Sequence, residues 1–225
     1  MTEPEPSTAQ AEPSAKTAKG VSERRELSKR EQAAARRAAE SKATVPHLYA
    51  RRTVELPSAE ALSAAVVVHA AARALRAQPG LNCTYRDGGL ELHSRVNVCL
   101  TVEMEGGSLA PTLFDADTKS VEQLDAEIDE LKEAARAGSL AAPALAGGTF
   151  TVSMADPGAE GMLLPVVVGQ AGHLVAGSPR RAVVCGPGGE PAAAWSVELG
   201  LSCDARAVKP ADAAAFLADT AATIG

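Results

Sequence analysis

The stretch LSCDARAVKP, residues 201–210, and the alanine-rich run at 211–217 that follows it carry the strongest fold signal in this chain. Residues 195–201 lead into the stretch as a β-strand. Pro210 suits the first position of a helix, because the N–H that proline lacks has no intrahelical partner there. We therefore predict a strand, a short turn that carries Asp204, Ala205 and Arg206, and a last helix.

The composition indicates one globular domain and argues against nucleic acid and metal as partners. With 225 residues, 46% of them hydrophobic and 22% charged, the chain can bury the core of one good-sized domain. A net charge of -6 offers no basic surface to a phosphate backbone. The four cysteines lack a Cys-x-x-Cys pair, so neither a zinc site nor a disulfide framework is expected. They are expected to be reduced thiols in a cytoplasmic protein: Cys83, Cys99, Cys185 and Cys203.

The N-terminal residues and the longest apolar run indicate how the chain is organised. Residues 1–20 contain almost no large apolar side chains, so we expect a disordered N-terminal arm there and a single domain over 21–225. The longest apolar run, at 64–72, is interrupted by His69 and is too short to span a bilayer. No membrane partner is expected.

Helix starts are marked by serines. Ser28 with Glu31, and Ser120 with Gln123, form capping boxes that predict two helices, the first ending near residue 41. Ser58 is predicted to open a further helix that runs to about residue 77. Strict alternation of apolar and polar side chains predicts the clearest strand, residues 96–104. Other predicted strands are residues 48–56, 166–168, 170–176 and 182–185.

Three other stretches accompany the first in a fixed order. They read ESKATVPHLY at 40–49, LAPTLFDADTKS at 109–120 and GGTFTVS at 147–153. Together with residues 201–210 they resemble the catalytic domain of 2-oxo acid dehydrogenase E2 acyltransferases, whose carboxy-terminal motif reads Asp-His-Arg-x-x-Asp-Gly. The resemblance covers about residues 27–225. Within the family, the sequence is most similar to stand-alone E2-like acetyltransferases of tetronate biosynthesis.

This resemblance implies a fold and an assembly. The fold is the chloramphenicol-acetyltransferase-like α/β fold, an α+β two-layer sandwich in which helices flank a mixed β-sheet. The assembly is a homotrimer with active sites at the subunit interfaces. Residues 21–225 would be a single E2-like acyltransferase domain, with acetyl-CoA as co-substrate and no bound cofactor or metal.

The resemblance also assigns the site. Asp204 and Arg206 match the motif, but Ala205 occupies the position of the general-base histidine. Lys209 stands where the family has a carboxylate or amide that braces the motif. Ser153 matches the serine whose hydroxyl stabilises the oxyanion. No residue is assigned to coenzyme A binding.

Ala205 removes a group that the family's chemistry needs. A methyl cannot accept a proton, and loss of a positioned general base costs on the order of 10² to 10⁴ in rate. Deliberate inactivation and natural decay both explain the alanine; we favour an inactivated form of a working enzyme. Rescue by Lys209 would need strong desolvation of its ammonium group, and rescue by His173 or Cys203 is less favoured still.

The expected function is acetyl transfer from coenzyme A to a hydroxyl of a small natural-product intermediate. The resemblance suggests the primary alcohol of a tetronate, with a downstream enzyme that eliminates acetate. Two alternatives stay open: a naturally inactive trimeric scaffold or coenzyme A-binding pseudoenzyme, and a lipoamide-dependent E2 fragment.

Overall fold

The computed structural model describes residue 18 and residues 20–104, 107–156, 158–186 and 188–225. The disordered arm expected at 1–20 therefore lies almost wholly outside the described residues. The helices are α1 (Lys29–Thr44), α2 (Ala64–Ala77), α3 (Val121–Arg136) and α4 (Pro210–Ile224). The strands are β1 (His47–Leu56), β2 (Cys83–Arg86), β3 (Gly89–Leu92), β4 (Val98–Leu100), β5 (Val102–Met104), β6 (Gly107–Leu109), β7 (Thr112–Leu113), β8 (Phe150–Met154), β9 (Gly172–Ala176), β10 (Arg180–Cys185) and β11 (Pro191–Asp204).

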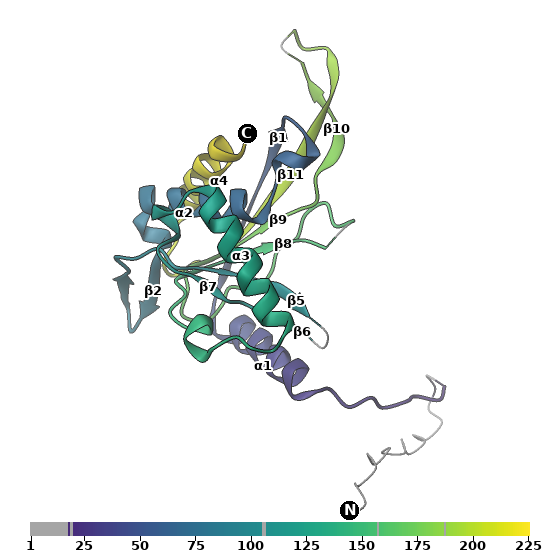
Figure 1. The fold of residues 1–225 in the computed structure, drawn as a ribbon, viewed down its shortest axis with the longest axis vertical. Helices are drawn as coiled ribbons and strands as arrows, with labels where there is room; N and C mark the ends of the chain where they lie inside the picture. Colours follow the sequence, from purple (N-terminus) through teal and green to yellow (C-terminus); the bar gives the residue numbers. More distant parts are fainter. Residues whose placement is uncertain (1–17, 19, 105–106, 157, 187) are drawn as a thin grey trace, which may run out of the picture.

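One mixed sheet organises these elements (Figure 1). Its strand order is β1-β11-β9-β8-β4-β7, and β10 pairs with β11 beside this path. The pairs β4 with β8 and β8 with β9 are parallel, whereas β11 is antiparallel to β1, β9 and β10. The predicted mixed sheet flanked by helices is confirmed.

One face of the sheet is apolar and carries the helices. Side chains alternate along a strand, so Leu199 and Leu201 of β11 share this face and join the buried core. Helices α2 and α4 pack on this face, and α3 lies beside α2. The fully buried ring of Phe150 in β8 meets that of Phe216 in α4, with 5.4 Å between their centroids. This contact joins the last helix to the middle of the sheet.

The opposite face is polar and is covered by an irregular segment, residues 158–170. Gly200 faces this side of β11, and a Cβ placed on it would lie 2.3 Å from the carbonyl oxygen of Met162. The backbones therefore touch at the crossing point, which only glycine permits. The segment encloses the polar side chains of β8 and β9 between itself and the sheet.

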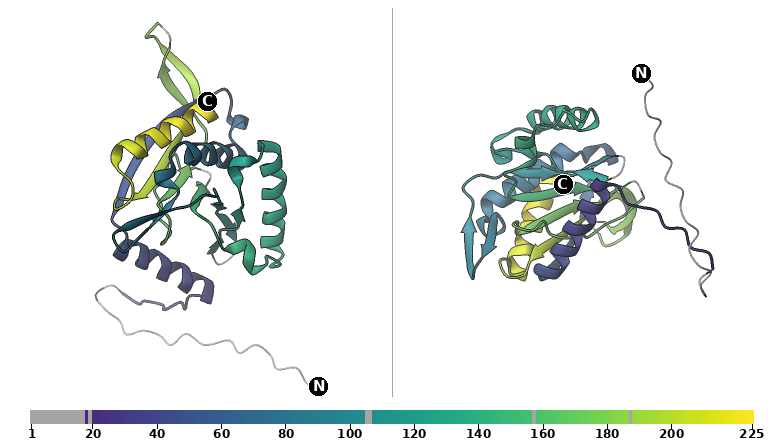
Figure 2. Two further views of the ribbon diagram at one scale, coloured as in Figure 1. Left: turned by 90° about the vertical axis from the view of Figure 1, so that its left-hand side faces the viewer. Right: turned by 90° about the horizontal axis from the view of Figure 1, so that it is seen from below.

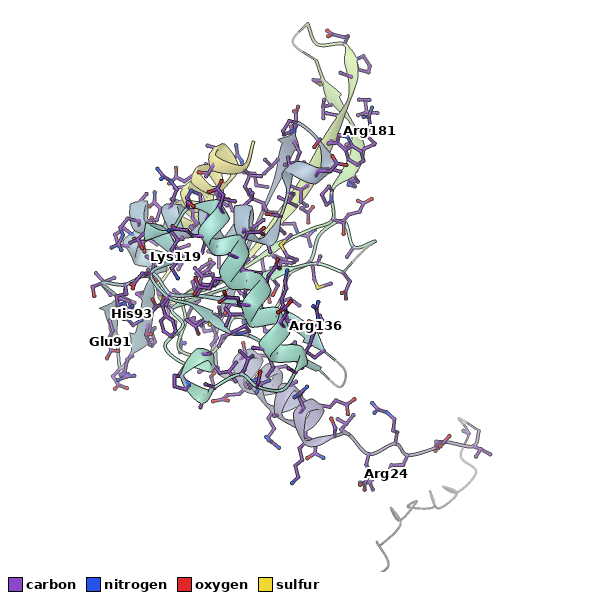
Figure 3. All side chains as sticks on the ribbon, viewed as in Figure 1. Arg24, Glu91, His93, Lys119, Arg136 and Arg181 are labelled. Atoms are coloured by element: carbon purple, nitrogen blue, oxygen red, sulfur yellow. The ribbon has the colours of Figure 1, made fainter. Side chains whose placement is uncertain are left out.

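The hairpin of β10 and the first half of β11 projects beyond the body of the molecule. In both Figure 1 and the left view of Figure 2 it stands at the end opposite α1. Arg181, labelled in Figure 3, lies over the ring of Trp195 at 5.6 Å. Val183 is 78% exposed on this hairpin.

Three predicted elements were wrong in detail. Residues 96–104 form two short strands, β4 and β5, because β4 pairs with β8 while β5 turns away to pair with β6. The second helix begins after Ser63, whose hydroxyl accepts a hydrogen bond from Val66 N at 3.2 Å. Residues 166–168 form no strand: the N–H and carbonyl of Val166 bind the side chains of His47 and Ser41, and the Val167 carbonyl accepts from Gln170 N. Both capping boxes and the start of the last helix at Pro210 are confirmed.

The crossing at Gly200 gives a stability prediction. Gly200→Ala should lower the free energy of unfolding by about 1–3 kcal/mol, the usual cost of overpacking, because the added methyl meets backbone that cannot rotate away. Gly80→Ala is the matched control: a Cβ there meets nothing within 4 Å, so we expect a change within about 0.5 kcal/mol. Urea unfolding followed by circular dichroism measures both, and equal effects would contradict the crossing.

Candidate functional site

The end of β11 forms a turn held by an ion pair. Asp204 is 3% exposed and accepts hydrogen bonds from Arg206 Nε at 2.9 Å and from Arg206 Nη2 at 2.7 Å. The backbone N–H of Arg206 also donates to Asp204 at 3.0 Å. The guanidinium lies 4.4 Å from the centre of the Tyr85 ring. Asp204 and Arg206 thus form a bidentate ion pair, which fixes the turn in one conformation.

Ala205 sits at the tip of this turn. Its side chain is exposed, and its N–H donates to the Pro46 carbonyl at 2.8 Å. The turn therefore presents a methyl group to the outside of the protomer. Lys209 is exposed at the start of α4, and its N–H donates to Asp212 at 3.4 Å. The bracing role expected at Lys209 stays a prediction.

Ser153 lies on the polar face, near the end of β8. It is 2% exposed, and its Oγ is 2.9 Å from His173 Nε2 and 2.7 Å from Thr101 Oγ1. The parallel pairing of β8 with β9 sets Thr151 opposite His173, which places Ser153 next along the same face. The structure therefore joins Ser153 to a histidine that the sequence interpretation had set aside.

His173 is held on both ring nitrogens. Nδ1 donates to the Pro165 carbonyl at 2.9 Å, so in the neutral ring Nε2 carries the lone pair that faces Ser153. Burial lowers the pKa of His173 below its ordinary value, which keeps the ring neutral near pH 7. A serine hydroxyl, a neutral imidazole and an orienting carbonyl is the arrangement that activates a hydroxyl. No sequence motif signals it.

The other side chains considered from the sequence are structural. Burial, with a smaller effect of Asp204, raises the pKa of the Cys203 thiol to about 12, so it cannot serve as a base near pH 7. His47 Nε2 accepts from Val166 N at 3.0 Å while Nδ1 donates to the Val45 carbonyl at 2.7 Å. Both nitrogens of His47 are thus satisfied, as expected for a histidine at a strand start.

Ser153 and Ala205 of one protomer are far apart. In the sheet register Ser153 is level with Val175 in β9 and hence with Gly200 in β11, five residues before Ala205. Strand spacing and rise place the two residues roughly 15–20 Å apart. A site that uses both positions needs a second copy of the chain.

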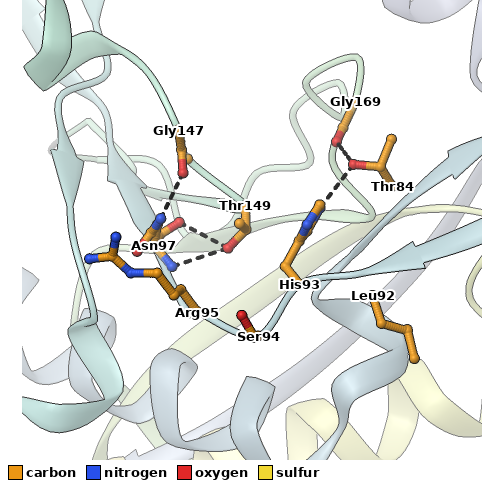
Figure 4. A pocket seen from close by; sticks show the side chains of 10 residues that line it. Thr84, Leu92, His93, Ser94, Arg95, Asn97, Gly147, Thr149 and Gly169 are labelled. Carbon is orange, nitrogen blue, oxygen red and sulfur yellow. Dashed lines mark hydrogen bonds between the residues drawn. The ribbon is translucent and has the colours of Figure 1, made fainter.

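A hollow of about 470 Å³ opens at the other end of β8 (Figure 4). Its polar lining is hydrogen-bonded internally: Asn97 Nδ2 donates to Gly147 O at 2.9 Å, and Thr84 Oγ1 donates to Gly169 O at 2.6 Å. Neither Ser153 nor Ala205 lines it. The hollow is therefore separate from the hydroxyl network.

Two classes of site are not found among the described residues. No group of three or more His, Cys, Asp or Glu side chains there could hold a metal ion. None of the described helices combines the length and apolar character needed to cross a membrane.

The fold matches that of known acetyltransferases. The structure matches that of a probable dihydrolipoamide acetyltransferase from Listeria monocytogenes with a TM-score of 0.84 and 25% identity, over 89% of this chain and 93% of that one. Dihydrolipoamide acetyltransferase of Azotobacter vinelandii matches with a TM-score of 0.86 and 23% identity over 96% of each chain. Chloramphenicol acetyltransferase matches with a TM-score of 0.51 and 13% identity, over 88% of this chain and 96% of that one, which confirms the predicted fold.

Sequence comparison gives the family. The 2-oxoacid dehydrogenases acyltransferase (catalytic domain) family matches residues 19–225, and this chain belongs to it. A dihydrolipoyllysine-residue acetyltransferase of the Zymomonas mobilis pyruvate dehydrogenase complex is 32% identical over 208 residues, 85% of this chain and 47% of that protein. Dihydrolipoyllysine-residue acetyltransferase component 3 of the mitochondrial pyruvate dehydrogenase complex of Arabidopsis thaliana is 36% identical over 155 residues, which are 68% of this chain and 29% of that protein. The chain thus spans less than half the length of these curated relatives.

Two histidines, the buried His173 and the half-buried His47, should make stability depend on pH. Burial lowers the pKa of both His47 and His173 below 6.5. Near that pH the unfolded chain therefore binds more protons than the folded chain. The free energy of unfolding should therefore fall as pH drops below about 6.5. Urea unfolding at about pH 7.5 and about pH 5.5 measures it. His47→Asn and His173→Gln should each shrink the difference between the two pH values, and an unchanged difference in both would contradict this account.

Proposed function

We propose that this chain is an acyltransferase domain that moves an acyl group between coenzyme A and a thiol or hydroxyl acceptor. The observation that carries the proposal is the intact Asp204–Arg206 turn in a chain of the E2 acyltransferase family. An ion pair that fixes the residue between its partners has a clear use where that residue must be aimed at a substrate.

The spacing of residues supports the assignment. A serine, a histidine and an asparagine were studied for their role in the catalytic mechanism of the Azotobacter enzyme. The same numbers of residues separate Ser153, Ala205 and Lys209 in this chain. We infer that these three positions correspond, with the base and the amide replaced.

The assembly we propose is a homotrimer. Ser153 and position 205 lie too far apart in one protomer to act on one substrate, so the site would form between copies. The exposed turn at Ala205 is free to meet the polar face of a neighbouring subunit. Static light scattering measures the number of copies.

Two acceptor classes follow from different observations. The names of the curated relatives favour the thiol of a dihydrolipoyl group. The resemblance of the sequence to stand-alone enzymes favours the primary alcohol of a tetronate, with an eliminating enzyme downstream. Acetyl-CoA is the acyl donor proposed for both, and both need the same removal of a proton from the acceptor.

Restoring the histidine tests the function. Ala205→His should raise acetyl transfer from acetyl-CoA by about 10² or more, because a positioned general base contributes 10²–10⁴. Release of the coenzyme A thiol measures the rate. Ala205→Gln, similar in size but not basic, is the control and should stay at the rate of the unaltered chain.

The same variant separates the alternatives. Transfer to dihydrolipoamide but not to primary alcohols identifies the lipoamide-dependent form, and the reverse identifies the hydroxyl-acetylating form. No transfer to either class by a folded Ala205→His trimer contradicts the proposed function and leaves the scaffold or coenzyme A-binding pseudoenzyme.

A further inference from the structure

The buried histidine beside Ser153 has no part in the chemistry outlined so far. His173 is 6% exposed, lies on β9 and touches Ser153 of its own chain. Buried polar groups must find partners, and a passive network would satisfy that need. The hydrogen bonds of the network and the position of its outer hydroxyl indicate a role in proton transfer as well.

The hydrogen bond at the inner end of the network has a fixed direction. The Pro165 carbonyl can only accept, so it holds the one proton of the neutral imidazole on Nδ1. Nε2 must then accept the proton of the Ser153 hydroxyl at 2.9 Å. The Ser153 hydroxyl can also donate to Thr101 Oγ1 across 2.7 Å. When its single proton is given to Nε2 instead, the Thr101 hydroxyl rotates about its C–O bond and donates to Ser153. In that state each hydroxyl proton points toward His173.

The outer end of the network is closest to solvent. Ser153 and His173 are buried, whereas Thr101 is half-buried just after β4. The Thr101 N–H donates to the Val152 carbonyl at 3.0 Å, which anchors the threonine against β8. A group that approaches this face therefore meets the Thr101 hydroxyl before the other two.

We propose that His173 is the terminal proton acceptor of acyl transfer in this chain, receiving the acceptor's proton through the hydroxyls of Thr101 and Ser153. The inference rests on the proposed acyltransferase function and names the group that replaces the missing base at position 205. It also gives Ser153 a further role, in which its hydroxyl passes a proton to His173.

The proton and bond changes balance. The acceptor oxygen or sulfur bonds to the acyl carbon as its proton passes to Thr101 Oγ1. Thr101 passes its own proton to Ser153, and Ser153 passes its own to His173 Nε2. When the tetrahedral intermediate collapses, the carbon–sulfur bond of the thioester breaks. The proton then returns along the same path to the coenzyme A sulfur, and the imidazole is neutral again.

The environment of His173 limits the rate. A buried imidazole is available as a neutral base, but the same burial opposes the positive charge that it must carry. A base of lowered pKa is a weaker proton acceptor. The unaltered chain should therefore transfer acyl groups measurably, and more slowly than Ala205→His.

The test compares one change in two backgrounds. His173→Gln keeps a polar side chain beside Ser153 but cannot accept a proton to form a cation. In the unaltered chain it should lower kcat on the order of 10²-fold or more while KM for acetyl-CoA stays the same. In the Ala205→His background, where the restored base takes the proton, it should change kcat by no more than about threefold.

The outcomes separate the two proposals. Equal losses in both backgrounds identify a structural role for His173 and overturn the inference, as does no loss in either. An unaltered chain without activity beside an active Ala205→His variant overturns the inference alone. Inactivity of both chains overturns the proposed function, and the inference with it.

A second variant keeps the test decisive if His173→Gln does not fold. Thr101→Val preserves the shape of the side chain, leaves the Ser153–His173 contact in place and removes only the outer hydroxyl. It should lower kcat in the unaltered chain and spare Ala205→His. Unchanged kcat in the unaltered chain would overturn the inference. Thr118→Val, which removes a hydroxyl that donates to the Asp115 carbonyl outside the site, is the matched control and should leave kcat unchanged.

Discussion

The long strand β11 is the constraint on which the rest of the structure depends. It runs for 14 residues and pairs with β1, β9 and β10. Its side chains alternate between an apolar face under the helices and a polar face, so its register decides which residues enter the core. A slip of one residue would expose Leu199 and Leu201 and bury Glu198. The same strand ends at Asp204, so the register also sets where the turn of Ala205 emerges.

The polar face is held by a segment that is not a strand. The carbonyl of Pro165 accepts from His173, and the N–H and carbonyl of Val166 bind His47 and Ser41. These backbone groups are free for side chains because no neighbouring strand uses them. The segment therefore fixes two imidazoles in their neutral forms while it shields them from water.

We propose two arrangements for proton transfer on this fold. One would use a base at position 205, which the ion pair of Asp204 and Arg206 presents at the surface, together with the Ser153 hydroxyl of another copy of the chain. The other lies within one chain and ends on His173. An alanine at position 205 excludes the first and leaves the second intact, because the two share only the hydroxyl of Ser153.

The sequence by itself indicated the family through its ordered motifs, and the resemblance to that family implied the layers of the fold. It also predicted the capping boxes and the turn at Asp204, which depend on neighbouring residues whose spacing is visible in the chain. Only the tertiary structure decided that residues 96–104 split between two sheets, that the backbone groups of Val166 bind side chains, and that Ser153 meets His173. Those results depend on contacts between segments far apart in the sequence, and the proton of the neutral His173 ring is held by a carbonyl that no local pattern can place.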